Sequence, residues 1–148
     1  MTITAAVWDY VKSRYFVAMN EMDIRWRQRF HNFQRTFGQL SNAVAKEELN
    51  DLERAGLIQF FEFSFELGWK TLKDYLNHQR VDVKYPRDVV KEAFRLELIS
   101  DGVWIDILEK RNLMAHTYDE EKAAEACQII ITSYFPALSA FNKYFQNV

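Results

Sequence analysis

Apolar side chains recur at alternating intervals of four and three residues along the first third of the chain. The residues concerned are Trp26, Phe30, Phe33, Phe37, Leu40 and Val44. This spacing is typical of a helix that packs along one face into a bundle, so we predict a helix over residues 22–44. Residues 1–21 carry a weaker version of the pattern, with Trp8, Val11 and Tyr15 at helical spacing. They predict a short amphipathic helix, which either stands apart or runs on into the next one.

The next apolar segment, residues 47–79, contains a run that imitates a β-strand. Five apolar residues alternate there with polar or small ones: Phe61, Phe63, Phe65, Leu67 and Trp69. A helix is favoured because apolar residues continue at helical spacing on both sides and no turn residues bound the run. Glu66 also precedes Lys70 in the stabilising i, i+4 order. A helix that is apolar on more than one side is central, so Glu62 and Glu66 on it need cationic partners.

Proline and glycine divide the rest of the chain. Pro86 suits the first position of a short helix, and a turn at residues 100–102 leads into a helix predicted for residues 102–115. In the last helix, Pro136 lacks the N–H that a helix uses and should kink it near Thr132. Every predicted element is therefore helical.

Composition supports the same class. Of 148 residues, 16% are aromatic, whereas only four are Gly and two are Pro, which favours long helices over many strands and turns. No repeat, low-complexity tract or linker interrupts the chain. We therefore predict an all-α protein with a single domain over residues 22–148 and an N-terminal extension over residues 1–21.

Charge and cysteine content limit the partners and the cellular compartment that the sequence predicts. A net charge of −2 predicts no general affinity for nucleic acid, although a local basic pocket is compatible with it. The single cysteine, Cys127, excludes an internal disulfide and suits a reducing compartment. No apolar run has the length of a membrane span, and the N-terminus lacks the pattern of a signal peptide. These features predict a cytoplasmic protein that does not associate with membranes.

An unusual arginine lies near the end of the helix predicted for residues 102–115. Arg111 falls within the apolar stripe that Trp104, Ile107 and Leu108 form on that helix. An arginine in such a position is either desolvated or faces a cleft, and it needs an anionic partner.

A helix start is predicted immediately afterwards. Thr117 and Glu120 have the spacing of a capping box, so we expect the next helix to begin near Tyr118. His116 and Tyr118 would then flank its N-cap, with free backbone N–H groups close to Arg111. Three polar side chains are thus predicted to meet at one helix junction.

Several chemistries are excluded or weakened by spacing. The three histidines lie on different predicted elements and no His or Cys pair has ligand spacing, so we predict no metal site. No glycine-rich phosphate loop is present, so the chain is not expected to bind a nucleotide unaided.

Arg111 and His116 remain as the candidate catalytic pair. An arginine can hold a phosphate through two parallel hydrogen bonds, and a histidine titrates near neutrality. Together they could cleave RNA without metal, with His116 moving a proton and Arg111 stabilising the phosphorane. The alternative is structural: Arg111 pairs with a glutamate of the second helix, and His116 satisfies a helix C-terminus.

The pattern Arg-Asn-x-x-x-His-x-Tyr, which begins at Arg111 and Asn112, resembles the signature of the HEPN superfamily. These are small all-helical proteins of prokaryotic toxin–antitoxin and defence systems. Residues 61–73 and 86–89 further resemble a branch called nucleotidyltransferase substrate-binding subunits, which are close to the HepT toxins. The resemblance covers roughly residues 22–145.

This resemblance implies an antiparallel up-and-down four-helix bundle with a short additional helix, usually as a homodimer. It also implies a cognate minimal nucleotidyltransferase, which would carry the ATP and magnesium, so no cofactor is expected in this chain. In the HepT-like interpretation, Arg111 and His116 of two protomers form an RNase site. Tyr118 then matches the tyrosine that the partner modifies with AMP, which silences the toxin.

A second interpretation is compatible with the same resemblance. The bundle would then be a non-catalytic subunit that only holds the substrate of its partner nucleotidyltransferase. We expect Asn112, Glu66 and Glu62 to support the site in either case. The sequence favours the RNase, because a pure binding module has no need of Arg111 and His116 together, and leaves the enzyme and binding interpretations both open.

Overall fold

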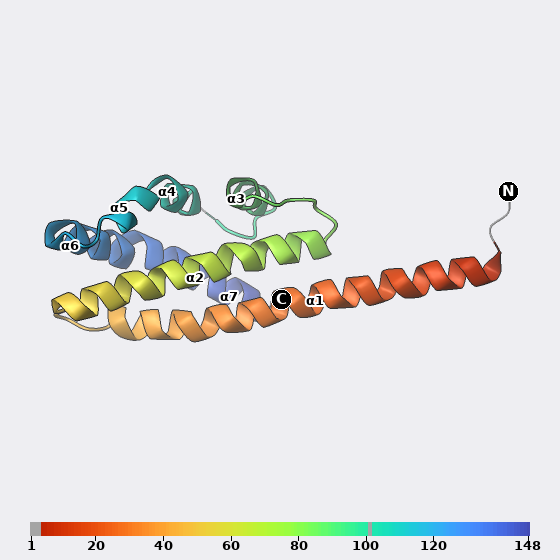
Figure 1. Cartoon of the computed structure of the whole chain (residues 1–148), viewed down its shortest axis with the longest axis horizontal. Coiled ribbons are helices and arrows are strands. Elements are labelled where there is room, and N and C mark those ends of the chain that lie inside the picture. The colour runs from red at the N-terminus through yellow and green to blue at the C-terminus, as the bar shows by residue number, and fades with distance from the viewer. Residues whose placement is uncertain (1–3, 101) are drawn as a thin grey trace.

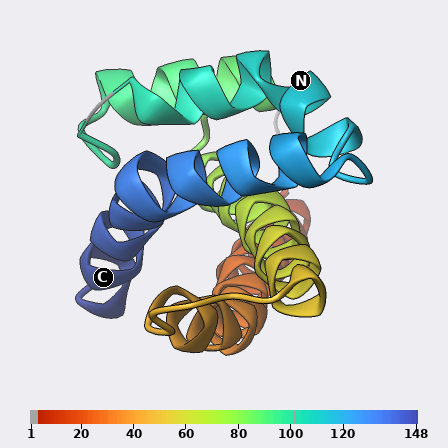
Figure 2. The ribbon, with the colours of Figure 1, turned by 90° about the vertical axis from the view of Figure 1, so that its left-hand side faces the viewer.

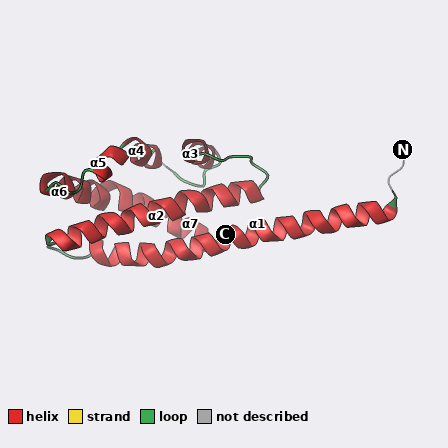
Figure 3. Cartoon of the chain, viewed as in Figure 1, coloured by secondary structure: helices red, strands yellow, loops and turns green. Residues whose placement is uncertain are grey.

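The structure is a computed structural model that describes residues 4–100 and 102–148, and within these residues every regular element is a helix (Figures 1 and 3). In chain order the helices are α1 (Ala5–Val44), α2 (Asp51–His78), α3 (Pro86–Arg95), α4 (Val103–Glu109), α5 (Arg111–Ala115), α6 (Glu120–Ile129), the π-helical turn η1 (Ile130–Tyr134) and α7 (Phe135–Gln146). The predicted all-α class is confirmed. The predicted turn at residues 100–102 includes Asp101, which lies outside the described residues, as do residues 1–3 of the extension.

Helices α1 and α2 run antiparallel along one side of the bundle, and α6, η1 and α7 form a bent rod that packs across α2 (Figures 1 and 2). Helices α3 and α4 cover the opposite side, and α3 is the short additional helix. Between these layers lies an aromatic core whose largest fully buried members include Trp26, Phe33, Phe61, Trp104, Tyr134 and Phe141.

Helix α1 is one continuous element, so the predicted N-terminal helix does run on into the next one. Its bundle half buries the predicted stripe, from Trp26 at 2% exposed to Leu40 at 0%. Its N-terminal half continues past the end of α2 and projects from the bundle (Figure 1). Thr4 caps this end, where its hydroxyl oxygen accepts a hydrogen bond from the Val7 backbone N–H at 3.4 Å.

Helix α2 forms over the alternating aromatic run, as predicted. Asn50 and Glu53 build a reciprocal capping box at its start. A mostly buried ion pair then joins it to α1: Arg29 Nε lies 2.6 Å from Oδ2 of Asp74, whose side chain is 7% exposed. Because an unpaired buried carboxylate is costly, this pair fixes the register of the two long helices.

Pro136 acts near the position that the sequence predicted. The turn before it, η1, widens to π-helical geometry between α6 and α7. Proline lacks an N–H and its ring clashes with the carbonyl of Thr132, so the helix accommodates it by loosening one turn. The rod bends there, and the fully buried Tyr134 lies within the bend.

Gly68 marks the closest approach between layers. A Cβ added at Gly68 would lie 3.0 Å from Cη2 of Trp104, which is itself fully buried, and 3.6 Å from Cε2 of Phe33. An added Cβ would push the buried indole aside by a few tenths of an ångström, so glycine lets α4 pack this closely on α2. By contrast, a Cβ at Gly56 of the same helix would meet nothing within 4 Å.

These two glycines provide a matched test of the packing. Gly56→Ala should stabilise the protein by up to about 1 kcal/mol through helix propensity alone. Gly68→Ala gains the same propensity but crowds the indole of Trp104, so its free energy of unfolding should lie about 1–3 kcal/mol below that of Gly56→Ala. Urea unfolding followed by circular dichroism measures both; equal stabilities would contradict the close approach.

Candidate functional site

The helix predicted for residues 102–115 is broken. It ends as α4 at Glu109, and α5 starts at Arg111 after Lys110 adopts φ −97° and ψ 21°. Neither glycine nor proline marks this position in the sequence. Helix α4 is held in the core, where the hydroxyl of Tyr134 donates to Oδ2 of Asp106 at 2.9 Å, whereas α5 is not tied to the core in this way. The prediction of one continuous helix was therefore wrong, and the break redirects Arg111.

Arg111 faces a cleft instead of lying desolvated in the core. Its side chain is exposed and lines a hollow of about 270 Å³ between α2, α4 and α5. The remaining lining is mainly apolar with two carboxylates: Phe61, Glu62, Phe65, Glu66, Ile107, Met114 and Ala115. Among the described residues, no carboxylate lies within ion-pair distance of Arg111, so its guanidinium remains available to a ligand.

The two glutamates of the cleft differ in environment. Glu66 accepts hydrogen bonds from Trp69 Nε1 at 2.9 Å and lies 3.0 Å from Lys70 Nζ, as the i, i+4 order predicted. Partial burial alone would raise the pKa of Glu66, but these two donors and the charges of Lys70 and Arg111 lower it. Partial burial raises the pKa of Glu62, which has no cationic partner among the described residues.

His116 and Tyr118 form a separate exposed pair. His116 is the C-cap of α5, and the hydroxyl of Tyr118 lies 3.4 Å from its Nδ1. Their rings meet edge to face, with centroids 5.9 Å apart, and Tyr118 is 85% exposed. His116 does not line the cleft that Arg111 faces. Within one protomer, the predicted catalytic pair therefore occupies the two ends of α5 without sharing a cavity. Asn112, beside Arg111, is exposed.

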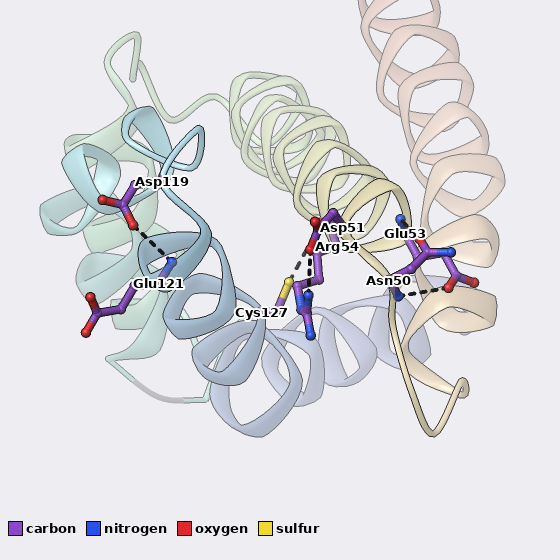
Figure 4. Close-up of polar contacts among 7 residues, drawn as sticks. All are labelled: Asn50, Asp51, Glu53, Arg54, Asp119, Glu121 and Cys127. Atoms are coloured by element: carbon purple, nitrogen blue, oxygen red, sulfur yellow. Dashed lines mark hydrogen bonds and ion pairs between the residues drawn. The ribbon is translucent and has the colours of Figure 1, made fainter.

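The predicted helix start was also wrong. Helix α6 begins at Glu120 with Asp119 as N-cap, whose Oδ1 accepts from the N–H of Glu121 at 2.9 Å (Figure 4). The same oxygen accepts from the N–H of Lys122 at 3.3 Å. Thr117 instead donates its hydroxyl to the carbonyl of Met114 at 3.2 Å. A carboxylate caps a helix as well as a hydroxyl does, and here it occupies two of the N–H groups predicted to be free.

A second hollow, of about 260 Å³, adjoins Tyr118. It is lined by Asp51, Arg54, Ala55, Thr117, Tyr118, Glu120 and Ala123. Arg54 was not predicted as a site residue, because it belongs to α2 and only the fold brings it to Tyr118. Its Nη1 lies 3.0 Å from Oδ1 of Asp51, and its carbonyl faces Sγ of the buried Cys127 at 3.7 Å (Figure 4). A second guanidinium, that of Arg54, therefore shares a hollow with Tyr118.

Within residues 4–100 and 102–148, no group of three or more His, Cys, Asp or Glu side chains is arranged to hold a metal ion. Over the same residues, no helix combines the length and apolar character that crossing a bilayer requires.

The chain has this helical fold and this junction between α5 and α6, and comparison with known proteins gives its family. Residues 28–147 match the family model described as nucleotidyltransferase substrate binding protein like, and the chain belongs to that family. It is 34% identical over 104 residues to a Haemophilus influenzae protein named probable ribonuclease HepT, across 64% of this chain and 71% of the relative.

A solved Haemophilus influenzae structure is similar as well. It is described as the substrate-binding domain of a nucleotidyltransferase and is 29% identical, with a TM-score of 0.57. The likeness covers 86% of this chain and 98% of that one. The projecting half of α1 precedes the residues that the family model matches.

The raised pKa of Glu62 predicts a pH dependence of stability. The folded state disfavours the ionised carboxylate, so the contribution of Glu62 to stability falls as pH rises from the unfolded pKa through the folded one. Glu62→Gln removes this loss. The urea midpoint of the variant minus that of the parent should therefore be larger at about pH 7 than at about pH 4.

Glu125→Gln, on the exposed face of α6, is the control and should show no such trend. A Glu62→Gln protein that gains stability toward acid instead would contradict the assigned environment.

Proposed function

We propose that this chain is a HepT-like toxin of a toxin–antitoxin pair, a metal-independent endoribonuclease that acts in the cytoplasm. The observation that carries the proposal is the availability of Arg111 and His116. Both side chains are exposed, at the two ends of one short helix, and neither is neutralised by an ion pair within the described residues. The similarity to a protein named probable ribonuclease HepT supports this choice.

The chemistry follows from the two side chains. His116 takes the proton of a 2′-hydroxyl as its oxygen attacks the adjacent phosphorus. The P–O5′ bond breaks, a 2′,3′-cyclic phosphate forms, and the leaving oxygen receives a proton from a second histidine or from water. Arg111 stabilises the doubly charged phosphorane through two parallel hydrogen bonds.

A homodimer would complete the site. In one protomer, Arg111 faces the α2 cleft and His116 does not line it. A two-fold axis close to α5 would bring Arg111 of one copy beside His116 of the other, in a groove that admits an RNA backbone. Because α5 is exposed along most of its length, such pairing requires no rearrangement of the core.

Tyr118 would be the control point, and a cognate minimal nucleotidyltransferase, carrying ATP and magnesium, would act on it. The tyrosine hydroxyl attacks the α-phosphorus of ATP, pyrophosphate leaves and the phenolic proton passes to solvent. Tyr118 suits this role because it is 85% exposed and touches His116. The attached phosphate would lie next to the hollow that Arg54 lines, where it would exclude an RNA phosphate.

Two single substitutions test the RNase. Arg111→Ala and His116→Ala should each lower cleavage of RNA about 10²–10⁴-fold with a chelator present, while helix content is unchanged. The parent should leave cyclic phosphate ends. Arg95→Ala and His31→Ala remove the same side-chain types from exposed positions elsewhere and should cleave like the parent. Equal activity in all four variants would sink the catalytic assignment.

Modification is tested by mass. The chain is incubated with the cognate nucleotidyltransferase, ATP and magnesium, and we expect one adenylate group on Tyr118 and loss of RNA cleavage. Tyr118→Phe should take up none and stay active. Tyr85→Phe is the matched control, since Tyr85 is 71% exposed and lies away from α5, and it should be labelled normally. Label retained by Tyr118→Phe would contradict the assignment.

The second candidate is a non-catalytic substrate-binding subunit. It is favoured by Glu62 and Glu66, because two carboxylates in the cleft of Arg111 weaken its attraction for a polyanion and suit a cationic small molecule. The incubation separates the two candidates: adenylate found on a small molecule and never on this chain would favour the subunit.

A further inference from the structure

The projecting half of α1 leaves a large apolar surface exposed, although the guanidinium carbon of Arg80 lies over the Tyr15 ring, 5.0 Å from its centroid. We call residues 5–22 the arm. Its exposed large hydrophobic side chains are Val7, Trp8, Tyr10, Val11, Tyr15, Phe16, Val17 and Met22, nearly half of all such side chains in the described part of the chain. Soluble surfaces rarely carry so many large apolar groups together unless something covers them. The family model begins after the arm, so the family match does not account for it.

Part of this surface is an ordered stripe. At about 100° per residue, Trp8, Val11, Tyr15, Ala18 and Met22 fall on the same side of α1. That side continues into the face of α1 that begins with Trp26 and is buried in the bundle. The stripe therefore has the spacing of a helix–helix seam, but within one protomer no helix lies against most of it (Figure 1).

We propose that the arm pairs with the arm of a second copy of this chain, antiparallel, as a short two-stranded coiled coil. In this register Tyr15 packs beside Ala18 of the second copy, and Val11 beside Met22. The two-fold axis then passes near the middle of the arm, and both bundles lie outside the paired segment.

The charges of the arm are complementary to those of a second, antiparallel arm. The arm carries Asp9, Lys12, Arg14 and Glu21, so its net charge is zero and gives it no net electrostatic attraction for RNA or an anionic membrane. On the flank of the stripe, the antiparallel register brings Arg14 beside Glu21 of the second copy, and symmetry repeats the pair. A seam of this register is thus apolar along its centre and oppositely charged at its flank.

A hollow beside Met22, where the arm joins the bundle, provides room for the N-terminal end of the second copy's arm. A hollow of about 560 Å³ lies there, lined by Met22, Lys73, Asn77, Arg80, Val81, Asp82, Val83 and Lys84. With Val11 beside Met22 of the second copy, Trp8 arrives at this hollow. A parallel pair would fail, because the bundles would meet at the same end on the side of α1 that the stripe shares with the core.

One pair of variants tests the stripe in the full chain. Val11→Glu places a charge in the seam and should weaken self-association at least about a hundredfold. Ser13→Glu adds the same charge on the outer side of the same arm and should associate like the parent. Sedimentation equilibrium gives the assembly mass, which should fall by half for Val11→Glu relative to Ser13→Glu at matched concentration. Equal masses would overturn the proposal.

A charge exchange tests the orientation. Arg14→Glu and Glu21→Arg each set like charges against one another across the seam and should weaken association about tenfold. An equimolar mixture of the two variants restores opposite charges in both symmetric contacts, so it should recover the parent affinity as a heterodimer. The double variant should also recover it. A mixture no stronger than its components would exclude the antiparallel register.

Discussion

The contact between Gly68 of α2 and the indole of Trp104 holds the layers of this protein together. The absence of a Cβ at Gly68 leaves room for the buried indole of Trp104, and the ring packs on Phe65 and Phe141, so that one side chain joins α4, α2 and α7. Because Trp104 is fully buried, α4 cannot shift without opening the aromatic core. The position of everything that follows α4 depends on this anchor.

The candidate site lies on α5, directly after the buried helix α4. Asp106 is fixed by the hydroxyl of Tyr134, the backbone breaks at Lys110, and α5 leaves the core with only Met114 buried. A rigid element thus ends immediately before a short exposed one. Arg111 and His116 keep a defined place on the fold while their polar groups stay in water, an arrangement suited to binding an external anion.

Much of the helical framework could be predicted because local spacing determines it. The stripe from Trp26 to Leu40 and the helix through Phe61 and Trp69 follow from periodicity, and Pro136 loosens the last helix where its chemistry requires. The break at Lys110 could not be predicted in this way. It depends on tertiary contacts of Asp106 and Trp104, and no local residue signals it.

The site residues show the same division. The motif singled out Arg111, His116 and Tyr118 as candidates. The capping residue was misassigned because Thr117 and Asp119 are both competent N-caps and the choice depends on where the chain turns. Arg54 was missed altogether, since only the packing of α2 beside α6 brings it to Tyr118.

The arm and α5 lie at opposite ends of the long axis of the molecule (Figure 1). If both proposed contacts between copies form, one through α5 and one through the arm, each protomer links to two others. If the two dyads intersect at right angles, four chains close into a tetramer with 222 symmetry; if they do not intersect, the chains continue as a filament. In such an assembly, the course of the single helix α1, which is 40 residues long, would set the angle between the dyads and so decide whether assembly terminates or propagates.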